Sequence, residues 1–177
     1  MSSDDVRRLF IEVDGKLIWK ERPVSDFKSQ RDCDAWNTRF AGIVAGSDNI
    51  YKTNKRRMIG INGKLYQRAQ LIWLLYKGSP PPVGKLLDHR NRDSLDDRIS
   101  NLRLATHSQN CSNSCLHKHN TSGRRGVHWD KQSGKWQAKI SVMKKVIYLG
   151  YFDDLDEAGD AYIKAAKKHF GEFIGAT

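Results

Sequence analysis

The sequence has few cysteines, no long apolar run and no internal repeat. The scarcity of cysteine argues against a disulfide-rich protein, and the lack of a long apolar run argues against a membrane-spanning one. Cys33, Cys111 and Cys115 are its three cysteines. An odd, small number of cysteines without a secretory segment argues against a disulfide framework and for a reducing compartment, so we expect a cytoplasmic protein. The longest apolar run, LIWLLY at 71–76, is far shorter than the ~20 residues that span a bilayer, so no membrane partner is expected.

Acidic residues are also scarce over long stretches of the chain. The net charge is +11, and residues 51–70 hold six Lys or Arg and no acid. Residues 121–150 hold seven Lys or Arg and one Asp. Clustered basic residues bind polyanions by releasing counterions from phosphate, which favours a nucleic-acid partner. A basic protein that is merely soluble is the alternative.

The pattern of strands, turns and helices indicates an α+β protein in three parts. Residues 1–66 form a β-rich region, with hairpin turns at Asp14-Gly15 and Asn62-Gly63 and an irregular stretch at 25–42. Residues 67–118 hold a buried helix at 68–77, followed by a strand, a long loop, a strand and a helix. Residues 119–177 form a three-stranded antiparallel sheet packed on one helix.

Residues 84–110 collect the groups that phosphodiester hydrolysis requires. Asp88 and His89 close one strand, Asn101 opens the next, and Asn110 lies near the start of the helix that Thr106 caps. Hydrolysis needs a base to activate water, and an imidazole serves near neutral pH. A hard divalent cation, bound by carboxylate and amide oxygens, neutralises charge on the phosphate and its leaving oxygen.

This spacing resembles the HNH nuclease superfamily, and more narrowly the phage and intron-encoded homing endonucleases whose last His is Asn. Asn101 and Asn110 follow His89 by twelve and twenty-one residues. The resemblance implies a ββα-metal finger in which His89 is the general base and Asn101 fixes its side chain. It also implies that Asp88 and Asn110 bind Mg²⁺ or Mn²⁺. The sequence departs from the family at Ala69-Gln70, where many relatives have His-Arg, and at 96–97, where a carboxamide often precedes the Arg.

The C-terminal part resembles the Apetala/ethylene-response-factor type of DNA-binding domain. The stretches that carry the resemblance are RRGVHW, GKWQAKI and YLGYFDDLDEAGDAYIKAAKKHFGEF. A twisted sheet face can enter the major groove of double-stranded DNA. By position, the DNA-facing residues are Arg125, His128, Gln137, Lys139, Ser141 and Tyr148.

Two alternatives stay open at this point. Cys111, Cys115, His117 and His119 lie within nine residues and suggest zinc, although such a local cluster converges poorly on a tetrahedron. For the whole chain, the leading hypothesis is a metal-dependent DNA endonuclease, expected to be a monomer. Nicking and double-strand cleavage both stay open, although one active site in a monomer favours a nick. The alternative is a DNA-binding regulator that keeps a nuclease-like fold without cutting.

Overall fold

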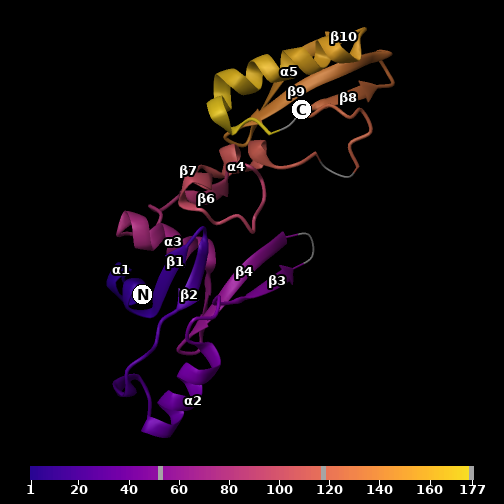
Figure 1. Cartoon of the computed structure of the whole chain (residues 1–177). Helices are drawn as coiled ribbons and strands as arrows, with labels where there is room; N and C mark the ends of the chain where they lie inside the picture. Colours follow the sequence, from indigo (N-terminus) through magenta and orange to yellow (C-terminus); the bar gives the residue numbers. More distant parts are fainter. Residues whose placement is uncertain (52–53, 117–118, 176–177) are drawn as a thin grey trace. The chain divides into compact units, whose positions relative to one another are not determined.

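The computed structural model describes residues 1–51, 54–116 and 119–175 (Figure 1). The chain forms two compact units. The first comprises Met1–Val83 and Leu87–Leu104, and the second comprises Gly84–Leu86 and the chain from Ala105 onward. The division expected from the sequence stays a prediction, since the unit boundary falls inside the segment 67–118. Helices and small antiparallel sheets occur in both units, so the fold is α+β.

The first unit is built from short elements around the buried helix α3. Its elements in chain order are α1 (Ser3–Leu9), β1 (Phe10–Val13), β2 (Lys16–Trp19), η1 (Val24–Asp26), α2 (Gln30–Phe40), β3 (Ser47–Tyr51), β4 (Asn54–Ile61), β5 (Lys64–Gln67), α3 (Arg68–Lys77), β6 (Leu86–His89), η2 (Ile99–Asn101) and β7 (Leu102–Ala105). β1 pairs with β2, β3–β4–β5 form one sheet, and β6 pairs with β7. The outer ends of β6 and β7, Leu86 and Ala105, are counted with the second unit.

The hairpin turns and the buried helix follow the sequence prediction. Asp14-Gly15 and Asn62-Gly63 have positive φ angles at both residues, the conformation of a type I′ turn. Helix α3 ends at Gly78, whose φ of 73° is the left-handed cap that glycine adopts at low cost. Leu71 and Ile72 of α3 are almost fully buried, and each contributes about 1.5–3 kcal/mol by burial. α3 is thus central to the core of the first unit, and its first residue, Arg68, contacts the loop that follows β6.

Two helices of the N-terminal region were not expected. α1 begins with a capping box between Ser2 and Asp5. The stretch expected to be irregular holds α2, whose N-terminus is capped by the Ser29 side chain. Trp36 of α2 packs edge-on against Trp19, with ring centroids 5.2 Å apart. The aromatic packing of Trp36 therefore helps to hold this helix on the core of the first unit.

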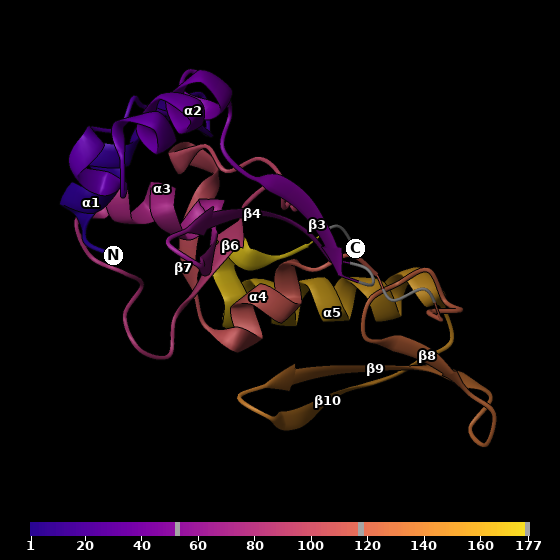
Figure 2. The same ribbon diagram turned by 90° about the horizontal axis from the view of Figure 1, so that it is seen from below.

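The second unit has the predicted three-stranded sheet and covering helix. Its elements are α4 (His107–Asn113), β8 (Val127–Asp130), β9 (Lys135–Val142), β10 (Lys145–Phe152), α5 (Leu155–Phe170) and η3 (Gly171–Phe173). The strand order is β10–β9–β8, and both pairs are antiparallel. α5 lies along one face of this sheet, and the opposite face is open (Figure 2). Asp154 caps α5 by accepting hydrogen bonds from two backbone amides.

Candidate functional site

Asp88 and His89 stand at the point where β6 ends. The strand stops at His89, and the chain turns through Arg92, whose φ is 66° and whose amide donates to the His89 carbonyl at 3.0 Å. Neighbouring strand residues point to opposite faces, so Asp88 and His89 can share a site only because the strand stops here. Asp88 is buried, and its Oδ2 accepts a hydrogen bond from Nε of Arg103 on β7 at 2.8 Å.

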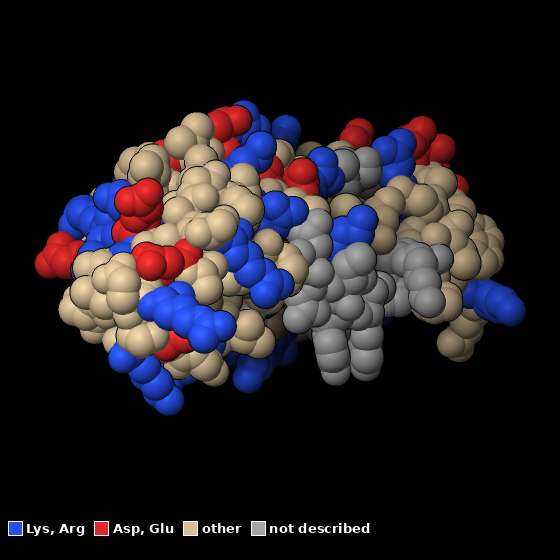
Figure 3. Space-filling model, turned by 60° about the horizontal axis from the view of Figure 1, so that its bottom comes forward, with Lys and Arg blue, Asp and Glu red and all other residues tan. Residues whose placement is uncertain are grey.

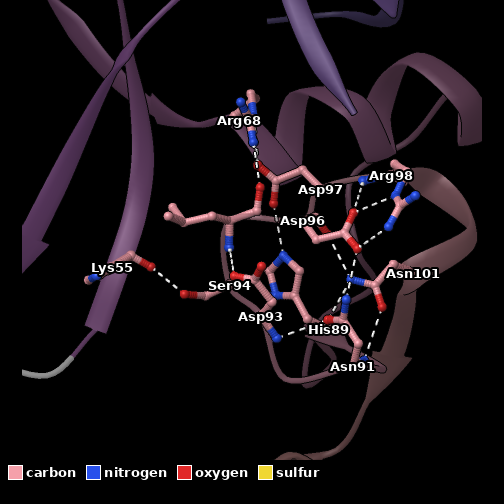
Figure 4. A network of polar contacts seen from close by, with 11 residues as sticks. Lys55, Arg68, His89, Asn91, Asp93, Ser94, Asp96, Asp97, Arg98 and Asn101 are labelled. Carbon is pink, nitrogen blue, oxygen red and sulfur yellow. Dashed lines mark hydrogen bonds and ion pairs between the residues drawn. The ribbon is translucent and has the colours of Figure 1, made fainter. Parts of the chain in front are cut away.

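Asn101 ties down the loop that follows His89. Its side-chain amide donates to Asn91 Oδ1 at 2.9 Å and to the Asp96 carbonyl at 2.7 Å (Figure 4). Its Oδ1 accepts from the Asn91 backbone amide at 3.0 Å, and its carbonyl accepts from the Arg90 amide at 2.9 Å. Asn101 therefore fixes the backbone on either side of the loop.

Hydrogen bonds and an ion pair between side chains of the loop 90–98 also hold its conformation. Asp96 accepts two hydrogen bonds from the Arg98 guanidinium, at 2.7 and 2.8 Å, and one from Asn91 Nδ2 at 2.8 Å. These bonds, led by the one from Arg98, lower the pKa of Asp96 to about 2. Ser94 donates to the Lys55 carbonyl of β4 at 2.6 Å, which joins the loop to the neighbouring sheet. The loop is a fixed part of the unit despite its polar sequence.

The imidazole of His89 contacts a carboxylate that the sequence analysis did not select. Nε2 of His89 lies 2.8 Å from Oδ1 of Asp97, and Oδ2 of Asp97 accepts from Nε of Arg68 at 2.7 Å. Arg68 and Asp97 are 3% and 2% exposed, so this ion pair is buried. The expectation that Asn101 orients the imidazole directly stays untested, but the carboxylate seen against the ring belongs to Asp97.

Asn110, the fourth residue of the constellation, lies in the second unit. Thr106 caps α4 through the predicted capping box with Gln109, and the Asn110 amide donates to the Thr106 carbonyl at 2.9 Å. Asn110 is therefore in the first turn of α4, as expected. The structure thus brings Asp88, His89 and Asn101 together in the first unit and places Asn110 on a helix of the second.

Five of the six residues expected to face DNA share one face of the C-terminal sheet. Residues paired across strands share a face, and successive residues alternate. Ala138 and Ile140 of β9 are buried on the α5 side, so their neighbours point away from the helix. The pairs His128–Gln137, Gln137–Tyr151 and Lys139–Tyr148, together with Ser141, define this surface, which we call the outer face. Trp129 and Trp136 pair on the opposite side, with ring centroids 5.1 Å apart.

Arg125 is the exception among the expected DNA-facing residues. It precedes β8, and its guanidinium donates to Ser114 Oγ at 3.3 Å, to the Cys111 carbonyl at 3.4 Å and to the Ser114 carbonyl. These contacts hold the C-terminal end of α4 and place the Arg125 guanidinium away from the outer face, and its expected contact with DNA stays a prediction. Basic side chains are spread over the face of the molecule drawn in Figure 3, and they do not gather into one patch.

The described residues give no support for a zinc site. Cys111 lies on α4, but the helix ends at Asn113, so Cys115 does not share a helical face with Cys111. His117 lies outside the described residues. Within the described ranges, no three His, Cys, Asp or Glu side chains form a group suited to a metal ion. Nor does that part of the chain contain a helix long and apolar enough to cross a membrane.

Comparison with known proteins finds a family that matches the segment containing these residues. A family model described as HNH endonuclease matches residues 66–111, a range that includes Asp88, His89, Asn101 and Asn110. Protein 3.8 of Escherichia phage T7 is 35% identical to this chain over 82 residues, which are 46% of this chain and 67% of that protein. No solved structure matches the chain. The chain belongs to the family of phage T7 Protein 3.8, and its residues 66–111 are an HNH endonuclease domain.

Proposed function

We propose that this protein is a divalent-metal-dependent DNA endonuclease. The observation that carries the proposal is that the HNH match covers the same segment in which β6 ends at Asp88-His89 and Asn101 fixes the following loop. Strand, loop, strand and helix follow one another here in the order of a ββα-metal finger. A protein that only binds DNA has no need of this set of side chains.

The roles follow from the chemistry of each group. His89 accepts the proton of the attacking water as general base. Asp88 and Asn110 offer carboxylate and amide oxygens, the donors that Mg²⁺ and Mn²⁺ take, and Mg²⁺ is commonly held by one or two protein groups with substrate phosphate and water. When bound, the cation stabilises charge on the phosphate and on the leaving oxygen. Asn101 keeps the loop after His89 closed, so that the base stays in place.

We propose that the outer face of the C-terminal sheet supplies DNA affinity. Lys139 and Tyr148 are exposed cross-strand neighbours, and Ser141 lies beside them on β9. Lys gains affinity by replacing counterions at phosphate, while Tyr and Ser add contacts in a groove. The face holds one Lys and one His among the expected contacts and no Arg, so bidentate recognition of bases is weak. The affinity is therefore expected to depend more on salt than on sequence.

Cleavage of supercoiled plasmid tests the proposal. With Mg²⁺ or Mn²⁺ the protein should convert supercoiled DNA to open circles, because one set of catalytic residues per chain in a monomer cuts one strand. Excess EDTA should stop the reaction. Full activity in chelator would exclude a metal-dependent enzyme. Tight binding in a gel shift, without cleavage under either metal, would favour a DNA-binding regulator instead.

A further inference from the structure

Asp97 joins the imidazole of His89 to the guanidinium of Arg68 through its two carboxylate oxygens. Oδ1 lies 2.8 Å from His89 Nε2, and Oδ2 lies 2.7 Å from Arg68 Nε (Figure 4). Arg68 is the first residue of α3, and its NH2 group also donates to the Leu95 carbonyl at 2.8 Å. The buried helix therefore holds both Asp97 and the loop that carries it.

The donors and acceptors in this arrangement fix the position of one proton. Arg68 has only donors, and a carboxylate in an ion pair has only acceptors. The short contact between Oδ1 and Nε2 therefore requires a hydrogen on Nε2. In a neutral imidazole with its hydrogen on Nε2, the lone pair is on the other ring nitrogen, Nδ1.

We propose that Asp97, held by Arg68, is a positioning residue that keeps His89 in its Nε2–H tautomer, with the accepting lone pair on Nδ1. The proposal rests on the proposed function for its catalytic meaning, because the lone pair matters only if His89 is the base. The tautomer itself is a property of the folded chain, and it can be measured without any reaction. Asp97 is buried, so water cannot replace Arg68 or His89 as its hydrogen-bond partner, and burial therefore strengthens the preference for this tautomer.

The substitution Asp97→Asn discriminates between positioning and mere packing. A carboxamide has one oxygen, and Arg68 can only donate, so that oxygen must face Arg68 Nε. The amide nitrogen then faces His89 Nε2 and donates to it. The imidazole hydrogen must move to Nδ1, and the lone pair needed for catalysis is consumed. The shape of the side chain is almost unchanged.

Removing Arg68 at the same time should release this constraint. In the double variant Arg68→Met, Asp97→Asn, the carboxamide is free to turn its oxygen toward His89 and to accept from Nε2–H. Asp96→Asn is the matched control, because Asp96 is the neighbouring carboxylate of the same loop and pairs with Arg98. The control makes the same chemical change without touching the Asp97 pair.

The experiment reads the ring nitrogens of His89 by ¹⁵N NMR in alkaline solution, on the full chain without metal or DNA. The His89→Ala spectrum identifies the His89 signals among those of the six histidines. Nε2–H is expected in the wild type, in Asp96→Asn and in the double variant, and Nδ1–H in Asp97→Asn. An Nδ1–H tautomer in the wild type, or an unchanged tautomer in Asp97→Asn, would overturn the proposal.

Single-turnover cleavage by the same variants gives the catalytic consequence. Asp97→Asn should lower the rate constant by about 10²–10⁴-fold, the range for losing a general base, with DNA affinity nearly unchanged. The rate constant of the double variant should be at least about tenfold higher than that of Asp97→Asn. A double variant no faster than Asp97→Asn, with the Nε2–H tautomer restored, would contradict the catalytic part. If the wild type does not cleave at all, the proposed function fails while the tautomer result stands by itself.

Discussion

The two units of this protein treat the polar and charged side chains of their candidate sites in opposite ways. The first unit buries Arg68, Asp88, Asp97 and Arg103, each less than a tenth exposed, in pairs joined by hydrogen bonds of 2.7–2.8 Å. The second unit leaves Lys139, Ser141 and Tyr148 in solvent on the outer face of its sheet. Buried charges are costly unless paired, and pairing holds each group in one geometry. Exposed groups remain free to adjust to a partner.

Under the proposed function, this difference separates the residues that act in the chemical step from those that bind DNA. A general base must be held within a fraction of an ångström, and a buried network provides that restraint. Contacts with a phosphate backbone tolerate movement, because much of their energy is long-range and screened by salt. Substitutions in the first unit should therefore change the rate of reaction, and substitutions on the outer face should change affinity.

The largest effect is expected from His89→Ala. If His89 is the general base, as proposed, this substitution should lower the single-turnover cleavage rate by about 10²–10⁴-fold. DNA affinity should stay near the wild-type value, because an imidazole that activates water contributes little to binding the ground state. Gel-shift affinity and single-turnover cleavage on the same protein sample measure both quantities.

Asp88→Ala provides the contrast for His89→Ala. It should also abolish cleavage, but through loss of a metal ligand, so raised Mn²⁺ should recover part of the activity. No concentration of metal should recover His89→Ala, because the proton acceptor is missing. A His89→Ala protein that cuts at the wild-type rate would falsify the assignment of the base.

A smaller effect, on binding alone, is expected from Lys139→Ala on the outer face. Losing one phosphate contact should weaken DNA binding several-fold at ~0.1 M salt and reduce the slope of log K against log salt by about 0.9. The cleavage rate at saturating protein should change little. Lys164→Ala removes the same charge from an exposed position of α5, which covers the other face of the sheet. Equal losses from the two substitutions would show that net charge, and not the outer face, sets the affinity.

The sequence predicts the elements of this fold where a local signal decides the structure. Asp14-Gly15 and Asn62-Gly63 define their hairpins because both residues must take positive φ. The alternation of β9 predicts which of its residues are buried. α2 was missed because Cys33 is its only buried residue, and the contact of Trp36 with Trp19 joins positions 17 residues apart in the chain. The capping box of α1, Ser2 with Asp5, is a local signal in the sequence from which this helix could have been predicted.

The spacing of the candidate residues can be read from the sequence, but the contacts that hold them in place cannot. The spacing of Asp88, His89, Asn101 and Asn110 resembles a family pattern, and the roles assigned to these residues stay predictions. Asp97 and Arg68 lie 29 residues apart, and their pairing depends on how α3 packs beneath the loop. The departure of residues 96–97 from the family pattern was the available signal. Only the folded chain shows that Asp97 contacts the imidazole whereas Asp96 contacts Arg98.

The smallest effect is expected from Asp96→Asn, and it concerns stability against pH. The hydrogen bonds from Arg98 lower the pKa of Asp96 to about 2 from its ordinary value of 3.8. A carboxyl whose pKa is lower in the folded state stabilises the fold above its unfolded pKa and loses that contribution as the pH falls through its folded pKa. Because Arg98 is half exposed, the contribution should be at most about 1 kcal/mol. Thermal unfolding should show the wild type more stable than Asp96→Asn above about pH 4, and the difference should shrink toward pH ~2.

Arg98→Gln should lose stability in the same pH window, and a difference that stays constant from pH ~5 to ~2 would rule out this ion pair as its cause.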